Sequence, residues 1–146
     1  MALQPFVSFS GNCREAVEFY AKVFGLGTPK FMTYGDMPPD DDMELVEADK
    51  GLIMYTDLAI SGAQVMFCDT PPGMPFISGN NISLTVVTKD EDEIKRLFNE
   101  LGDGGEVEME LQKTFWAKLY GAVSDKFGIH WQFSHDSGKD YMDNPG

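Results

Sequence analysis

The two histidines of the chain, His130 and His135, stand close together and raise the first chemical question. Both lie in the segment SDKFGIHWQFSHD, residues 124–136. An imidazole can bind a metal ion or exchange a proton near neutral pH. The residues after the glycine of this segment also alternate between apolar and polar, which is typical of a strand with one buried face. The segment therefore predicts either a metal or catalytic site, or a strand whose imidazoles have structural roles.

His130 shares the polar side of this expected strand with Gln132 and Ser134. We expect that side to line a cavity or its rim, where His130 is a candidate catalytic residue, acting as a general base or as a partner for an anion. The alternative is a hydrogen-bonded histidine at the start of a strand, which is the more common role of such a residue. His135 stands at the start of a C-terminal tail, 136–146, that we expect to be loose, and we assign it no function.

The composition excludes two kinds of partner. The chain has 146 residues, enough for one compact domain with a substantial core, and 42% of them are hydrophobic. Its formal net charge of −13 would repel both nucleic acid and an anionic membrane. The sequence shows neither a long apolar span nor the pattern of a signal peptide, so we expect a cytoplasmic protein. The two cysteines, Cys13 and Cys68, match no disulfide or zinc pattern and are expected to be free thiols.

The elements that would position these residues come as a duplicated unit. Residues 7–25 align without a gap on residues 84–102, and both segments predict a strand followed by an amphipathic helix that ends on a glycine. Asn12 with Glu15, and Thr88 with Glu91, have the spacing of a capping box at the start of each helix. Residues 62–69 align on residues 128–135 as the closing strands of the two halves.

Each half has room for further strands between its helix and its closing strand. We expect first strands at 4–10 and 81–87, and further strands at 30–34, 53–60, 107–111 and 116–124. The fold class is therefore α+β. Two βαβββ units, about 3–69 and 80–135, are expected to form one domain, 1–135, and the acidic loop 35–51 and the segment 69–81 to be connections.

The segments GNCREAVEFYAKVFG and LQKTFWAKLYGAVSDKFGIHWQFS add a resemblance to a known family. They resemble the vicinal oxygen chelate superfamily, which includes glyoxalase I, fosfomycin-resistance proteins and extradiol dioxygenases, and more narrowly its PhnB-like branch. The resemblance covers residues 3 to 135 and implies curled, mixed and mostly antiparallel sheets of the glyoxalase/bleomycin-resistance type. It also implies a homodimer, and a cup in which side chains from both halves point at one divalent metal.

The four positions at which the resemblance implies metal ligands carry poor ligands in this chain. They fall at Pro5 or Phe6, at Met66, at Asn81 or Ser83, and at Gln132, where glyoxalase-type relatives carry a glutamate four residues after the glycine. A thioether is a soft ligand, and an amide brings no negative charge to offset the dehydration of a hard cation. We therefore expect no metal and no other cofactor.

These observations favour a metal-independent protein that binds, or acts on, a small polar molecule. The residues expected to contact that molecule are Gln64, Met66, Asn81, Ser83, His130 and Gln132 in the cup, and Phe115 and Trp116 near its rim. Two alternatives stay open. One is a metal-dependent lyase, transferase or dioxygenase whose ligands have moved, for example to His130, Gln132 and Asp69. The other is a non-enzymatic binding or interaction module. No glycine-rich turn follows an opening strand, so nothing in the sequence supports a nucleotide methyl donor.

Four other features have both a structural and a functional interpretation. The segment from Lys113 to Trp116 could close a pocket wall, or fill a core or a dimer interface. Tyr34 could hydrogen-bond a ligand, although turn formation alone explains the residues after it. Cys68 is more simply a buried, inert thiol than a nucleophile. The acidic segment 38–42 lacks the ligand spacing of a calcium loop and is interpreted as a solvated loop.

Overall fold

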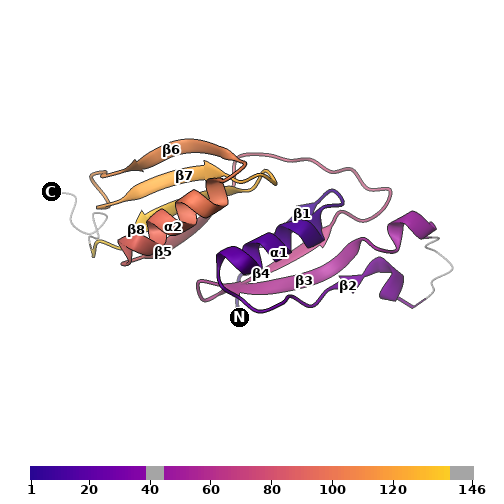
Figure 1. Cartoon of the computed structure of the whole chain (residues 1–146). Coiled ribbons are helices and arrows are strands. Elements are labelled where there is room, and N and C mark those ends of the chain that lie inside the picture. The colour runs from indigo at the N-terminus through magenta and orange to yellow at the C-terminus, as the bar shows by residue number, and fades with distance from the viewer. Residues whose placement is uncertain (39–44, 139–146) are drawn as a thin grey trace. The chain divides into compact units, whose positions relative to one another are not determined.

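The computed structural model describes residues 1–38 and 45–138 and divides the chain into two compact units, Met1–Ile77 and Ser78–Gly146. Each unit is a four-stranded sheet with one helix across a face (Figure 1). The expected α+β class with two βαβββ units is therefore confirmed. The acidic segment that we weighed as a calcium loop lies outside the described residues from position 39 onward. Within the described residues, none of the helices has the length and apolar character needed to cross a membrane.

Unit 1 contains the strands β1 (Phe6–Phe9), β2 (Met32–Thr33), β3 (Ile53–Ile60) and β4 (Ala63–Asp69), and the helix α1 (Cys13–Val23). Its strand order is β1-β4-β3-β2, with β1 parallel to β4 and the other pairs antiparallel. The expected strand 30–34 is shorter than predicted because the chain enters a 3-10 turn at Tyr34. The expected strand 53–60 has the bounds that the sequence predicted.

Unit 2 contains β5 (Leu84–Thr88), α2 (Glu91–Gly102), β6 (Glu106–Gln112), β7 (Tyr120–Ser124) and β8 (His130–His135). Its strand order, β5-β8-β7-β6, repeats that of unit 1, again with one parallel pair at the first strand. The strand expected at 116–124 begins later, at Tyr120. The reason is a local turn in which Thr114 N donates to Ala117 O at 3.0 Å and Ala117 N donates to the Thr114 hydroxyl at 3.1 Å.

The start of α1 is capped by a residue from the far end of its unit. The capping box expected at Asn12 is wrong, because the Asn12 side chain makes no capping hydrogen bond. Instead, the Asp69 carboxylate at the end of β4 accepts from the backbone N–H of Gly11 at 2.9 Å and of Cys13 at 3.0 Å. The helix ends as predicted on Gly25, which has a positive φ of 65°. There Leu26 N bonds to Ala21 O, the hydrogen bond of a Schellman motif.

The start of α2 is capped locally, although not by the residues that the sequence suggested. Asp90 is the N-cap, and its side chain accepts from Glu93 N at 3.1 Å, so the box expected at Thr88 and Glu91 is wrong. Gly102 ends this helix for a reason that differs from the role of Gly25. A Cβ at Gly102 would lie 3.2 Å from a methyl group of Val123, so glycine lets the last turn approach β7 closely.

The helix of each unit covers an apolar face of the sheet. In unit 1, Tyr20 of α1 packs on Phe67 of β4 with ring centroids 5.8 Å apart, and Phe9 of β1 lies 6.2 Å from the same ring. In unit 2, Phe98 of α2 packs edge-on against Phe133 of β8 at 6.1 Å. Because side chains alternate along a strand, the residues between these buried positions must lie on the sheet face away from the helix.

The two units differ in the register of their parallel strands. Phe6 pairs with Met66 in unit 1, so the duplicated alignment predicts that Ser83 pairs with Gln132 in unit 2. The structure instead pairs Thr85 with Gln132, two residues further along β5. A shift of two residues keeps every side chain on its original face, so the duplication tolerates it.

His135 belongs to β8 and is 8% exposed, and the chain just after it is held in place. Its Nε2 lies 3.1 Å from Lys89 O, and its Nδ1 lies 2.8 Å from the Ser137 hydroxyl. Asp136 N donates to Thr88 O, and the Ser137 hydroxyl accepts from Lys118 N. Residues 136 and 137 are therefore hydrogen-bonded to the rest of unit 2, and the expected tail lies outside the described residues from position 139 onward.

Candidate functional site

The polar residues of β8 lie on the sheet face opposite α2, as the alternation predicted. His130, Gln132 and Ser134 are half-buried, while Trp131 and Phe133 between them are buried on the helix side. The polar side chains of this face are joined to neighbouring strands by hydrogen bonds. We call the group Ser83, Glu108, Tyr120, His130 and Gln132 the unit 2 polar face.

Gln132 is the centre of a hydrogen-bonded chain across three segments. The Tyr120 hydroxyl from β7 donates to Gln132 Oε1 at 2.6 Å, and Gln132 Nε2 donates to the Ser83 hydroxyl at 3.0 Å, just before β5. Both ends of the amide are therefore engaged, which fixes its orientation. Of the expected site residues, the structure brings Ser83 and Gln132 into direct contact.

Tyr120 is a site residue that the sequence analysis missed. Burial, and then the nearby charge of Glu108, raise the pKa of its phenol above the ordinary value, so the hydroxyl keeps its proton as a hydrogen-bond donor. The ring of Trp116 meets the ring of Tyr120 edge-on at 5.3 Å, and Phe115 meets Trp116 at 4.8 Å. These aromatic contacts place the expected rim residues beside the unit 2 polar face. Phe115 is 78% exposed, which excludes it from the core of unit 2.

Glu108 is the second residue that the sequence analysis missed, and a β-bulge explains its position. Val107 pairs with Val123, and Met109 pairs with Ala122. Two residues along β6 therefore correspond to one residue along β7, and Glu108 is the extra residue. A bulge redirects side chains at its position. Here it allows a Glu108 carboxylate oxygen to contact Nδ1 of His130, two strands away.

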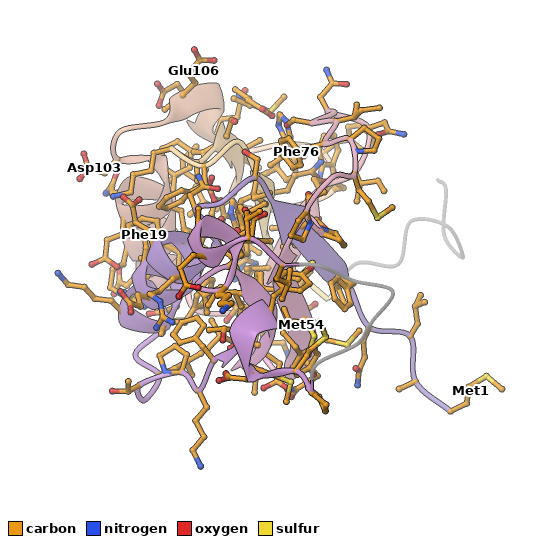
Figure 2. The ribbon with its side chains drawn as sticks, turned by 90° about the vertical axis from the view of Figure 1, so that its right-hand side faces the viewer. Met1, Phe19, Met54, Phe76, Asp103 and Glu106 are labelled. Atoms are coloured by element: carbon orange, nitrogen blue, oxygen red, sulfur yellow. The ribbon has the colours of Figure 1, made fainter. Side chains whose placement is uncertain are left out.

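The turn that leads into β6 adds acidic side chains at one end of this strand. Asp103 and Glu106 extend away from the ribbon into solvent (Figure 2). Glu106 pairs in register with Ser124, which pairs in turn with His130. The surroundings of the unit 2 polar face on the β6 side are therefore negative.

The remaining expected ligand contacts are spread over other segments. Gln64 and Met66 lie on β4 of unit 1, where Met66 pairs with Phe6 and with Asp57 on the two neighbouring strands. Asn81 is exposed in the segment before β5.

Asp125 explains the DKFG segment that carried the family resemblance. This buried carboxylate accepts from Phe127 N at 2.8 Å, from Ile129 N at 3.0 Å, and from the indole Nε1 of Trp131 at 2.8 Å. Gly128 follows in the positive-φ conformation that this turn requires. The motif therefore builds the β7–β8 connection that presents His130 and Gln132.

Asp69, which we considered as a displaced metal ligand, has a structural role in unit 1. Its Oδ1 caps α1, its Oδ2 accepts from Ile53 N at 2.8 Å, and its backbone oxygen accepts from the Tyr34 hydroxyl at 2.9 Å. Tyr34 is 5% exposed, so the ligand contact weighed for it is replaced by this interior hydrogen bond. Both cysteines are buried, and burial raises the pKa of the Cys13 and Cys68 thiols, as expected for inert groups.

The four positions that the superfamily uses for its metal do not fit a divalent cation here. Phe6 and Met66 offer no hard ligand, and the Gln132 oxygen already accepts the Tyr120 hydroxyl hydrogen. Elsewhere in the described part of the chain, no three His, Cys, Asp or Glu side chains come together as metal ligands would. Glu108 and His130 contact each other, but they supply two potential metal-binding side chains and not three.

Comparisons with known proteins agree with this fold. A solved protein from Pseudomonas aeruginosa, PA1353, is 34% identical, with a TM-score of 0.79 over 92% of this chain and 97% of that one. The PhnB protein of Bacillus cereus, titled a putative 3-demethylubiquinone-9 3-methyltransferase, is 24% identical with a TM-score of 0.71 over 92% and 99%. A glyoxalase/bleomycin resistance protein/dioxygenase from Alicyclobacillus acidocaldarius is 14% identical with a TM-score of 0.52 over 92% and 90%.

The chain therefore shares its fold with a glyoxalase/bleomycin resistance protein/dioxygenase. Protein YjdN of Escherichia coli (strain K12) is 32% identical over 141 residues, covering 92% of this chain and 95% of that protein. The family model described as 3-demethylubiquinone-9 3-methyltransferase matches residues 1–134. The chain belongs to this family.

Proposed function

We propose that this protein binds a small polar molecule at the unit 2 polar face without a divalent metal. The observation that carries the proposal is the double engagement of Gln132, whose oxygen accepts from Tyr120 and whose nitrogen donates to Ser83. An amide held in this way places a neutral hydrogen-bonding group where metal-using relatives carry a metal-binding glutamate. The side chain at this position therefore supports direct recognition of an organic molecule.

The aromatic residues beside the unit 2 polar face support the same proposal. Trp116 is half-buried against Tyr120, and an indole ring in that situation offers a flat apolar surface next to polar groups. Small-molecule sites combine such surfaces with a few fixed hydrogen-bonding groups. Binding and catalysis are both compatible with this arrangement, and the first test concerns binding.

Calorimetry tests the absence of a metal requirement. Protein purified without a nickel column and treated with chelator is titrated with Mn²⁺, Ni²⁺, Zn²⁺ and Fe²⁺. We expect no stoichiometric binding. Tight binding at one equivalent that His130→Ala abolishes would instead support a metal-dependent lyase, transferase or dioxygenase.

A fragment screen in crystals tests the binding site itself. We expect fragments at the unit 2 polar face in the wild-type protein and their loss in Gln132→Ala, with Asn99→Ala as a matched amide removal on the exposed side of α2. A polar face that binds no fragment in repeated soaks would favour the non-enzymatic interaction module.

We do not propose methyl transfer, although the description of the family names it. A nucleotide methyl donor is commonly held by the backbone amides of a glycine-rich turn at a helix start. At the start of α1 the amides of Gly11 and Cys13 already donate to Asp69. This arrangement supports a structural role for that turn.

We further propose that the protein is a cytoplasmic homodimer. Exposed apolar side chains on unit 2 support an interface, since Val107 and Met109 on β6 are 46% and 39% exposed and Phe115 is 78% exposed. Light scattering coupled to size-exclusion chromatography tests the dimer. A mass of one chain at micromolar concentration would contradict it.

A further inference from the structure

We propose that Glu108 holds His130 in its Nδ1–H form, so that Nε2 is a proton acceptor at the unit 2 polar face, and that the molecule bound there is a planar N–H donor such as an amidine or an amino-heterocycle. This inference rests on the proposed binding function. It adds the chemical class of the ligand.

The tautomer follows from the partner of Nδ1. At neutral pH a carboxylate can only accept hydrogen bonds, so Nδ1 of His130 must carry the proton that the contact with Glu108 requires. In a neutral imidazole the other nitrogen then has a lone pair and accepts. Nε2 has no hydrogen-bond partner among residues 1–38 and 45–138, and the side chain remains 20% exposed.

A β-bulge lies at the residue that makes this pairing, Glu108. Val107 and Met109 are two residues apart, yet their partners Val123 and Ala122 are consecutive and lie on opposite faces of the sheet. Glu106, two residues before Glu108, is in register with Ser124 and through it with His130, so Glu108 lies on the same face of the sheet as the imidazole. The acidic side chain at this bulge meets the imidazole, and in the described part of the chain Glu108 forms no ion pair with a lysine or arginine.

The charges around the site favour a nitrogen compound over an anion. Glu108 contacts the imidazole directly, Glu106 is next along β6 on that side, and Tyr120 stays neutral because its phenol pKa is raised. An anionic ligand would be repelled by these carboxylates. A planar cation would be attracted to them and could also stack on the Trp116 ring.

The ligand can also accept a hydrogen bond at the same face. The Ser83 hydroxyl accepts from Gln132, which leaves its own hydrogen to donate. Leu84 pairs with Trp131, so the residues just before them, Ser83 and His130, are neighbours in register at about 5 Å. A molecule with an N–H donor and a nearby ring nitrogen or oxygen would satisfy both groups.

The tautomer can be measured in the ligand-free full chain. Long-range proton–nitrogen NMR of histidine-labelled protein reads which ring nitrogen carries hydrogen. The two histidines should differ, because Nε2 of His135 contacts the carbonyl oxygen of Lys89 and must be its protonated nitrogen. We expect Nδ1–H at His130 and Nε2–H at His135. An Nε2–H form at His130 in the wild type would overturn the inference.

Ligand class is tested with three matched probes: benzamidine, benzamide and benzoate. We expect benzamidine to shift the resonances of His130, Ser83 and Gln132, benzamide to do so more weakly, and benzoate to leave them unchanged. Glu108→Gln should weaken benzamidine binding about threefold to fivefold, as for a partly exposed ion pair. Glu91→Gln, which removes the same charge from α2, should have no effect.

The outcomes separate this inference from the proposed function. Benzoate binding at the unit 2 polar face as tightly as benzamidine would overturn the ligand class and leave the binding site standing. Benzamidine binding that Glu108→Gln does not change would also overturn it. If no probe and no fragment shifts these resonances, the proposed function fails first.

Discussion

The Tyr120 hydroxyl lies 2.6 Å from Oε1 of Gln132 and donates to it. This contact joins β7 to β8 on the face away from α2 and sets the orientation of the amide. The amide then directs its nitrogen to Ser83. The Gln132 oxygen therefore already has a hydrogen-bond donor from the neighbouring strand.

The alkaline titration of Tyr120 should respond to Glu108. Burial first, and the Glu108 charge second, raise the phenol pKa, so the folded state holds this proton at a pH where the unfolded chain releases it. The contribution to stability is therefore complete below the ordinary tyrosine pKa and is lost as pH rises through the folded-state pKa. Glu108→Gln should lower the pKa of Tyr120 and reduce the alkaline loss of stability.

Tyrosine-labelled NMR over pH 8 to 12 measures this effect, with Tyr34 as the internal control, whose pKa is raised by burial in unit 1. An unchanged Tyr120 titration in Glu108→Gln would show that the carboxylate does not act on the phenol. A shift of both tyrosines would indicate a general change in the fold.

Asp69→Ala should destabilise the protein much more than removal of the local cap of α2. The change leaves three backbone N–H groups, those of Gly11, Cys13 and Ile53, without their acceptor. The amides of Cys13 and Ile53 are buried and that of Gly11 is partly buried, so at about 1 kcal/mol or more for each group the loss should be about 3 kcal/mol. Asp90→Ala removes one exposed N-cap bond and should cost about 1 kcal/mol.

Urea unfolding followed by circular dichroism compares these two variants. Equal losses of stability in Asp69→Ala and Asp90→Ala would contradict the assignment of Asp69 as the cap of α1.

Asp125→Ala should loosen the turn that presents the unit 2 polar face. The substitution removes the acceptor for two backbone amides and for the Trp131 indole N–H. We expect a loss of about 3 kcal/mol and a change in the indole N–H resonance of Trp131. Asp103→Ala, in the exposed turn after α2, should change stability by about 0.5 kcal/mol or less. A Trp131 resonance that stays in place would argue against the hydrogen bond.

Both thiols should be slow to react in the native protein. Cys13 is 0% exposed and Cys68 is 7% exposed, and burial is the first cause of the raised pKa of each. Since the thiolate is the reactive form, reaction with Ellman's reagent at pH 8 should be at least about tenfold slower than after unfolding in guanidinium. One thiol that reacts within the mixing time in the native state would contradict this burial.

The sequence predicted the parts of the fold that depend on short-range patterns. The duplicated strand and helix periodicity gave both βαβββ units, the bounds of β3, and the polar and apolar faces of β8. Side-chain alternation and helical spacing are local properties, so a single amino-acid sequence is enough to detect them. The expectation that Ser83 and Gln132 belong to one site came from the positions that the family resemblance implies.

The features that the sequence did not predict depend on long-range contacts or on local irregularity. The cap of α1 comes from Asp69, 56 residues beyond Cys13, and no local pattern signals it. Alternation places Glu106 and Glu108 on the same face, but only the pairing of β6, β7 and β8 brings Glu108 to His130. Tyr120 lies within the expected strand 116–124. Its role depends on the hydrogen bond to Gln132, which exists because β7 pairs with β8.

The capping of α1 by Asp69 has a consequence for the order in which the chain can fold during synthesis. The segment of α1 leaves the ribosome first, yet the carboxylate that accepts from its first amides is added 56 residues later. The segment of α2 is made with its own cap, since Asp90 and Glu93 are three residues apart. The helix that is synthesised first, α1, therefore has its cap only when β4 is complete, whereas α2 has its cap as soon as its own first turn is made.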